Sequence, residues 1–144
     1  MKQTTTRILT LLTICAVCCA ALLSCTFGDP VKKPWDDATY TQDTALGEGE
    51  ITFYFTVNVE EHHVTFTVST NETNLRRALQ ALSLIAGEES EYGLYVKTVN
   101  GITADYDTDG AWWALYEGDE MSMVGVDGVT VSPDGRYSFT YTKG

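Results

Sequence analysis

The sequence predicts an α+β fold, in which a small mixed and mainly antiparallel sheet packs one helix on one face in a β-grasp-like arrangement. Two patterns support this prediction. Apolar and polar residues alternate over several short segments, and one segment between them repeats its apolar residues with helical spacing. The resulting order is two strands, one helix, and then four or five short strands.

The first two strands are predicted from strict alternation. The segment "ITFYFTVNV", residues 51–59, places Ile, Phe and Val on one face and Thr, Tyr and Asn on the other. The segment "HVTFTVST", residues 63–70, repeats the pattern. The polar "EEHH" between them predicts a hairpin.

The helix is predicted where the period changes, within residues 70–89. Thr73 or Asn71 can cap its start, and Gly87 suits the left-handed turn that ends it. The apolar stripe that should lie on the sheet comprises Leu75, Ala78, Leu79, Leu82 and Ala86.

The second half returns to short strands separated by turn residues. Asn100-Gly101 is a strong tight-turn signal, and the segments 117–120, 127–128 and 133–135 have turn composition as well. The predicted strands are "YGLYVKTV", "ITADY", "WWALY", "MSMVGV", "VTV" and "RYSFTYT".

The start of the chain predicts a lipoprotein signal peptide over residues 1–24. Lys2 and Arg7 flank the start of a run of 16 mainly apolar residues, 8–23, which is shorter than the roughly 20 that a membrane-spanning helix needs. The run ends in "LLSC", with an aliphatic residue three positions before Cys25 and a small one directly before it. This pattern is typical of a bacterial lipoprotein, whose cysteine thiol accepts a diacylglyceryl chain. Ordinary secretion with cleavage elsewhere is the alternative.

A lipid on Cys25 would anchor the mature chain to the outer face of the cytoplasmic membrane of a Gram-positive bacterium. Residues 25–48 are rich in Asp, Thr, Gly and Pro without sustained periodicity, which predicts a flexible tether. Residues 49–143 form one domain of ordinary small size. All four cysteines lie at or before position 25, so we expect no disulfide in that domain.

Charge argues against one class of partner. Removing the signal peptide takes away Lys2 and Arg7, which leaves seven basic and 20 acidic residues and a net charge of −13. Such a chain repels polyanions. We therefore expect no nucleic-acid partner.

The segment "ADYDTDG", residues 104–110, resembles the start of a calcium-binding loop. Asp105, Asp107, Asp109 and Gly110 match positions one, three, five and six of an EF-hand loop, where alternate carboxylates bind Ca²⁺. The twelfth position should be Glu but is Tyr116, and the flanking segments are predicted strands rather than helices. The three aspartates are candidate metal ligands, and a solvated hairpin loop is the alternative.

Aromatic residues concentrate in the second half of the chain, and four of them are candidate ligand contacts: Tyr106, Trp112, Trp113 and Tyr116. Neighbouring residues on a strand point to opposite faces, so one of the two tryptophans should point inward. Exposed Tyr and Trp side chains make contact surfaces for flat ligands, sugars or protein partners. The alternative is that they cover a thin sheet.

No catalytic constellation emerges from the sequence. The mature chain offers no thiol nucleophile, and His62 and His63 are adjacent in a predicted turn, where they cannot easily chelate one metal ion together. No pattern places two carboxylates in an apolar cleft, as acid–base catalysis would require. We therefore expect a protein that is not an enzyme.

The second half also resembles a known family, the bacterial surface-lipoprotein domains of unknown function that are related to the C-terminal β-domain of transcobalamin and intrinsic factor. The match begins at about Ile51 and includes the helix "NLRRALQAL". The residues on which the resemblance rests are Tyr92-Gly93, Asn100-Gly101, Ala104-Asp105, Trp113, Tyr116, Gly118, Gly125-Val126, Gly135 and Phe139-Thr140-Tyr141.

The resemblance implies a small β-rich fold with one helix on anchored or multidomain surface proteins. In the vitamin carriers this domain closes over cobalamin together with a helical domain, a partner that we do not expect within this chain. Bacterial members look like binding or adhesion modules, and some are described as candidate metal-binding proteins. The leading hypothesis is thus a lipid-anchored module that binds a small ligand, such as a corrinoid. The alternative is a Ca²⁺-stabilised structural or adhesion module that contacts a surface protein.

Overall fold

The computed structural model describes residue 28 and residues 30–144, and one compact unit runs from Lys33 to Gly144. The predicted signal peptide and the lipidation site Cys25 lie outside the described residues. Among the residues that are described, no helix is long and apolar enough to cross a membrane.

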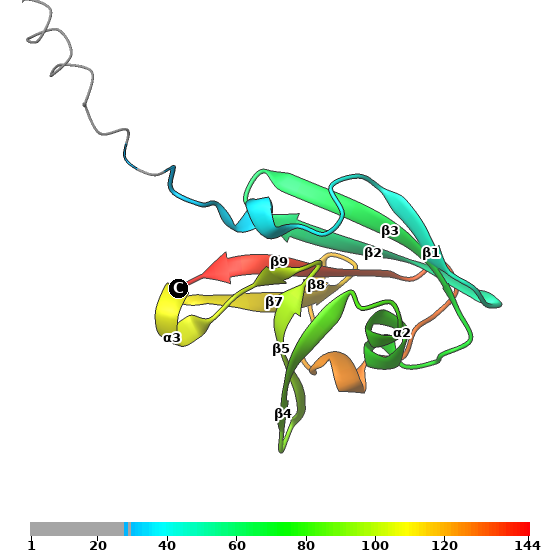
Figure 1. Ribbon diagram of the computed structural model, residues 1–144. Coiled ribbons are helices and arrows are strands. Elements are labelled where there is room, and N and C mark those ends of the chain that lie inside the picture. Colours follow the sequence, from blue (N-terminus) through cyan, green and yellow to red (C-terminus); the bar gives the residue numbers. More distant parts are fainter. Residues whose placement is uncertain (1–27, 29) are drawn as a thin grey trace, which may run out of the picture. The chain divides into compact units, whose positions relative to one another are not determined.

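The predicted α+β class is confirmed, with the strands divided between two sheets (Figure 1). The larger sheet has the order β1 (Thr44–Gly47), β3 (His62–Thr70), β2 (Ile51–Val59), β9 (Arg136–Lys143), β7 (Ala111–Glu117) and β8 (Glu120–Met121). The smaller has the order β4 (Ile85–Ser90), β5 (Gly93–Val99) and β6 (Ile102–Thr103). The helical elements are α2 (Leu75–Ala81), α3 (Tyr106–Asp109) and the 3-10 turns η1 (Pro34–Asp37) and η2 (Val126–Gly128).

The larger sheet is mixed, as the sequence predicts. The β2–β3 hairpin is antiparallel, with Phe55 opposite Phe66. β9 lies beside β2 in parallel and beside β7 in antiparallel orientation, so the strand nearest the C-terminus is central. The β4–β5 hairpin of the smaller sheet extends away from the larger one (Figure 1).

One face of the larger sheet forms the core together with the single main helix. Leu75 and Leu79 of α2 have no exposed surface, and the same is true of most inward residues of β2 and β3: Phe53, Phe55, Val57, Val59, Val64, Phe66 and Val68. Burial of such side chains contributes about 1.5–3 kcal/mol each. The prediction of one helix on one face is therefore confirmed.

The helix boundaries differ from those predicted. The side chain of Asn74, not of Thr73 or Asn71, caps the start by accepting a hydrogen bond from the Arg77 amide. The helix ends at Ala81, well before Gly87. Ser83 takes a positive φ of 57°, and the amides of Ser83 and Leu84 donate to the carbonyls of Gln80 and Leu79, which is the Schellman geometry that ends many helices.

The segment beyond the helix is a strand that the sequence reasoning missed. Gly87 lies at the bulge in β4, where a Cβ would overlap the Tyr95 carbonyl of β5. Ala86, the last residue of the predicted apolar stripe, lies on β4 and is exposed, whereas Leu84 and Ile85, which are outside that stripe, are buried. Periodicity alone cannot separate a strand from a helix over so short a run.

The tether predicted for residues 25–48 is wrong from Lys33 onward, because residues 33–47 are part of the folded unit. β1 pairs in parallel with β3, and the ring of Trp35 stacks on His62 at 5.0 Å. Tyr40 packs edge-on against Phe66 at 5.3 Å. These contacts come from isolated aromatic residues and a four-residue strand, which leave no periodic signal in the sequence.

Candidate functional site

The larger sheet has a second face, opposite the core, which we call the open face. The pairing registers assign its outward positions, and all of these except Ala114 keep at least partial exposure. The open face comprises His63, Thr65, Thr67 and Ser69 of β3; Thr52, Tyr54, Thr56 and Asn58 of β2; Arg136, Ser138, Thr140 and Thr142 of β9; and Trp112, Ala114 and Tyr116 of β7.

Three of the four predicted aromatic contacts meet on or beside this face. Trp112 and Tyr116 point outward from β7, opposite Thr142 and Ser138 of β9. Tyr106 reaches the same end of the sheet from α3, where its ring lies 6.0 Å from that of Trp112 at 54°. Tyr106 is 60% exposed and Trp112 is partly exposed, so a ligand can reach both rings at least in part.

Trp113 is a core residue and does not join them. It is 7% exposed, its indole N–H donates to the Lys97 carbonyl at 3.1 Å, and its ring packs edge-on against Tyr141. Strand alternation predicts that one of the two tryptophans points inward, and Trp113 is that one. It is not available to a ligand on the open face.

A hollow of about 240 Å³ lies at the other end of the open face, where β2 and β9 meet the β7–β8 turn. The Arg136 guanidinium lies 4.9 Å from the ring centre of Tyr54, an arrangement in which the ring face attracts the cation. The hollow is lined by Tyr54, Thr56, Asn58, Gly118, Asp119, Arg136, Tyr137 and Ser138. The sequence reasoning did not single out this hollow, because it depends on the parallel β2–β9 pairing.

The acidic segment forms the short helix α3 instead of a metal-binding loop. The Asp105 carboxylate caps this helix by accepting a hydrogen bond from the Asp107 amide at 2.9 Å. Gly110 ends it in the left-handed conformation with φ 62°. In the described part of the chain, no three His, Asp or Glu side chains converge as a metal site would require. Asp105, Asp107 and Asp109 are therefore close in sequence but do not form a ligand set in this conformation.

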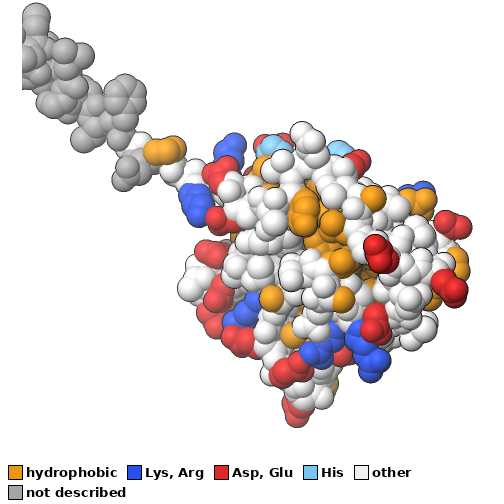
Figure 2. Space-filling model, turned by 45° about the vertical axis from the view of Figure 1, so that its right-hand side comes forward, with side chains coloured by type: hydrophobic (Ala, Val, Ile, Leu, Met, Phe, Trp, Pro, Cys, Tyr) orange, Lys and Arg blue, Asp and Glu red, His pale blue; other side chains and the backbone are white. Residues whose placement is uncertain are grey.

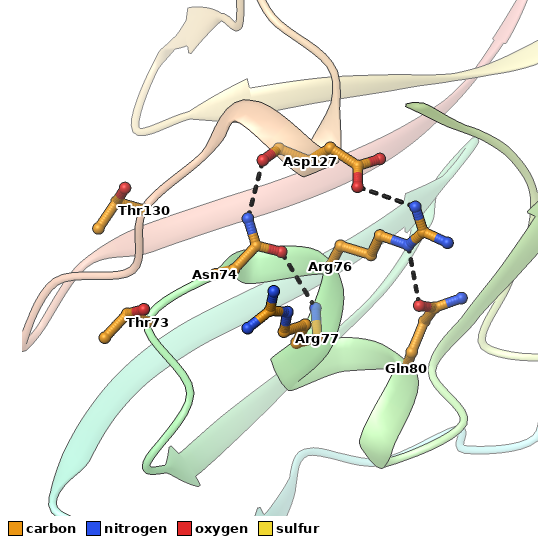
Figure 3. Close-up of a pocket in the computed structure, with 7 residues that line it drawn as sticks. All are labelled: Thr73, Asn74, Arg76, Arg77, Gln80, Asp127 and Thr130. Carbon is orange, nitrogen blue, oxygen red and sulfur yellow. Dashed lines mark hydrogen bonds and ion pairs between the residues drawn. The ribbon is translucent and has the colours of Figure 1, made fainter. Parts of the chain in front are cut away.

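A second polar hollow, of about 580 Å³, lies between α2 and η2 (Figure 3). Arg76 donates to the Asp127 carboxylate at 2.8 Å and to the Gln80 side chain at 3.0 Å. Asn74 donates to the Asp127 carbonyl at 2.8 Å. These groups satisfy one another across the hollow, so their evident role is to fasten η2 to the helix.

The Asp127 carboxylate also connects η2 to the smaller sheet. Asp127 accepts a hydrogen bond from the Leu94 amide of β5 at 2.7 Å. Burial acts to raise the pKa of Asp127, but this amide and the Arg76 guanidinium outweigh it and hold the pKa below its usual value. Asp127 is therefore a structural hub between α2, η2 and β5.

A third hollow, of about 240 Å³, lies beside β5 and the segment 121–126. It is the least polar of the three, and the side chains of Met121 and Val124 at its margin are about half exposed. Of the four predicted aromatic contacts, Trp112 and Trp113 contribute to its lining, but Trp113 is almost completely buried.

Negative charge dominates the surface around these features. The sequence holds 20 acidic residues against nine Lys and Arg. Figure 2 shows acidic side chains distributed widely over the visible side of the molecule, with fewer basic ones among them. The molecule as a whole will favour neutral or cationic ligands over anionic ones.

Comparison with known proteins links the chain to one family. Residues 72–143 match the model of a domain of unknown function, DUF4430. A crystal structure of a candidate metal-binding protein from Ruminococcus gnavus is 30% identical, with a TM-score of 0.62 over 66% of this chain and 99% of that protein. Haptocorrin in complex with Cbi matches at 21% identity and a TM-score of 0.49, over 65% of this chain but only 25% of haptocorrin. No curated protein sequence matches the chain.

Proposed function

The chain belongs to the DUF4430 family of domains of unknown function, and on that basis we propose that it is a non-enzymatic binding module held on the outer face of a Gram-positive cytoplasmic membrane. A lipid on Cys25 supplies the anchor. The open face of the larger sheet supplies the contact surface, at which the module takes a small ligand.

One observation supports the binding surface above the others. Tyr106 and Trp112 come from different elements, lie 6.0 Å apart and remain accessible, on a face that the main helix leaves uncovered. Aromatic side chains that are not needed in a core are typical anchors of binding surfaces. The other tryptophan of the pair, Trp113, already serves the core.

The family resemblance indicates a corrinoid as the small ligand, and a corrinoid titration tests whether this surface binds it. Cyanocobalamin titration of the full-length protein in detergent, followed by tryptophan fluorescence, should quench Trp112 and saturate. Trp112→Phe should remove most of the quenching, while Trp35→Phe should leave it. Unchanged wild-type fluorescence at high ligand concentration would exclude the corrinoid.

The anchor is tested separately. Cys25→Ser should abolish labelling by radioactive palmitate and release the protein into the medium or leave its signal peptide uncleaved. Retention of the mutant in the membrane fraction, together with an unlabelled wild type, would refute lipidation.

A calcium-stabilised adhesion module is the second candidate, because the relative that is 30% identical is described as a candidate metal-binding protein. Binding would require the carboxylates of Asp107 and Asp109 to converge with Asp105. Calorimetry at millimolar Ca²⁺ should then show heat and a raised melting temperature in the wild type, and neither in Asp107→Ala/Asp109→Ala.

Asp105 is left intact in that experiment because its side chain caps α3. Asp119→Ala/Glu120→Ala removes the same charge from the β7–β8 turn and is the matched control. If both double mutants respond to Ca²⁺ like the wild type, the metal does not bind at the acidic segment.

A further inference from the structure

We propose that the ligand of the open face is a neutral glycan, and that the hollow at Tyr54 and Arg136 is one of its subsites. This inference rests on the proposed function, because it names the ligand class for the same surface. It follows from three properties of the open face: its charge, its hydrogen-bonding groups, and the placement of its aromatic rings.

The charge of the open face contrasts with that of the whole chain. The sequence carries 20 acidic residues, yet none of the outward positions of β3, β2, β9 and β7 is Asp or Glu. Arg136 is the one residue among them that always carries a charge, and its guanidinium lies over the Tyr54 ring. Asp119, from the β7–β8 turn, is the one carboxylate that lines the hollow. Outward strand positions without a carboxylate, in so acidic a molecule, favour an uncharged ligand.

Apart from His63 and Arg136, the polar groups of the open face are hydroxyls and one amide, which can both donate and accept hydrogen bonds. They already form cross-strand pairs: Thr52 with Ser69 at 3.3 Å, Thr56 with Thr65 at 3.0 Å, and Asn58 with Thr140 at 3.3 Å. Each pair uses only part of its members' capacity. Sugar hydroxyls, which also donate and accept, match the unused donors and acceptors of these groups. A purely apolar partner would bury those donors and acceptors, at a cost of about 1–3 kcal/mol for each one left without a partner.

The aromatic rings extend along the same surface. Trp112 and Tyr116 are four residues apart on β7, a separation of about 13 Å along the strand. Tyr116 lies opposite Ser138, a residue that lines the hollow. A track thus runs from the Tyr106–Trp112 pair past Tyr116 to the Tyr54–Arg136 pair. Ring faces can pack against the apolar C–H faces of successive sugars, and the intervening hydroxyls can bind their edges.

Affinity electrophoresis tests the proposal with defined probes. Full-length protein in a polyoxyethylene detergent, which carries no sugar, is run through native gels containing laminarin, xyloglucan, galactomannan, amylose or the anionic polygalacturonate. At least one neutral polysaccharide should retard the wild type, and polygalacturonate should not. Trp112→Ala and Tyr54→Ala should each weaken binding at least tenfold, since each removes one end of the track.

Trp35→Ala is the matched control, because Trp35 is also partly buried but packs on His62 away from the open face. It should bind within twofold of the wild type. Absence of retardation by every neutral polysaccharide overturns the proposal, and so does retardation that Trp112→Ala leaves unchanged. Quenching by cyanocobalamin that depends on Trp112, without glycan binding, overturns the glycan but leaves the proposed function standing. A dimer that Trp112→Ala dissociates assigns the face to a second copy instead.

Discussion

Asn100 fastens the segment 33–47 to the turn between β5 and β6. It is 1% exposed, and its side chain accepts a hydrogen bond from the Tyr40 amide and donates one to the Tyr40 carbonyl, both at 2.9 Å. Its backbone adopts a positive φ of 51°, which Asn tolerates better than most residues. Two substitutions separate these roles: Asn100→Gly removes the side-chain bonds alone, and Asn100→Ala also places an unsuitable side chain at that φ.

The two substitutions should lower the free energy of unfolding by different amounts. Loss of two hydrogen bonds costs about 1–3 kcal/mol, at about 0.5–1.5 kcal/mol each. Ala adds about 1 kcal/mol for the left-handed backbone. Stability should therefore fall in the order wild type, Asn100→Gly, Asn100→Ala.

Urea denaturation measures this order, and hydrogen exchange locates its cause. The Tyr40 amide should lose protection in both mutants. Asn58→Ala is the matched control, because it removes a single 3.3 Å side-chain bond on the open face and should cost less than about 1 kcal/mol. The reasoning fails if Asn100→Gly unfolds within about 0.5 kcal/mol of the wild type, a difference near that of an ordinary surface substitution, or if Tyr40 keeps its protection.

Three further comparisons test the packing. The pKa of Asp127 is depressed in the folded protein, so its contribution to stability is present above about pH 4 and is lost as the pH falls through the folded-state value. Urea titrations should show that Asp127→Asn lowers the free energy of unfolding at pH 7, and that this loss becomes smaller below pH 4. Gly93→Ala should lower the free energy of unfolding by about 1–3 kcal/mol, because φ is 102° and a Cβ would lie 2.5 Å from the Asp127 carboxylate; Gly118→Ala, with φ 62° and open space around it, should cost less. In the same assay Trp113→Ala should lower the free energy of unfolding by about 3–5 kcal/mol, and Trp112→Ala should lower it by under about 1 kcal/mol. Similar losses of stability in both mutants would contradict the assignment of the two side chains to opposite faces of the sheet.

The strands that alternate strictly were predictable from sequence, and the reason is physical. In β2 and β9 one face is mainly buried and the other is mainly accessible to solvent. Apolar residues therefore alternate with polar ones along each strand. The tight turn at Asn100-Gly101 was predictable for a similar reason, since both residues take positive φ values there. Local patterns reveal structure when the local environment alone determines the residue.

Features that depend on distant pairing were not predictable. The docking of Trp35 and Tyr40 relies on His62 and Phe66, which no spacing in the sequence connects to them. The hollow at Tyr54 exists because β9 lies parallel to β2, with Tyr54 opposite Arg136. The aspartates of α3 matched a metal motif by spacing, but the strand before them and the cap at Asp105 place them on a helical turn.

The central position of β9 also affects how the chain folds while it is being synthesised. The β2–β3 hairpin is local in sequence, but β2 and β7 are joined within the sheet by β9, residues 136–143, which pairs with both of them. Until these residues arrive, one edge of β2 and one edge of β7 remain unpaired, and such edges are sites of aggregation. We expect the nascent domain to depend on chaperones until residues 136–143 are available, and truncations before residue 136 to be degraded instead of accumulating.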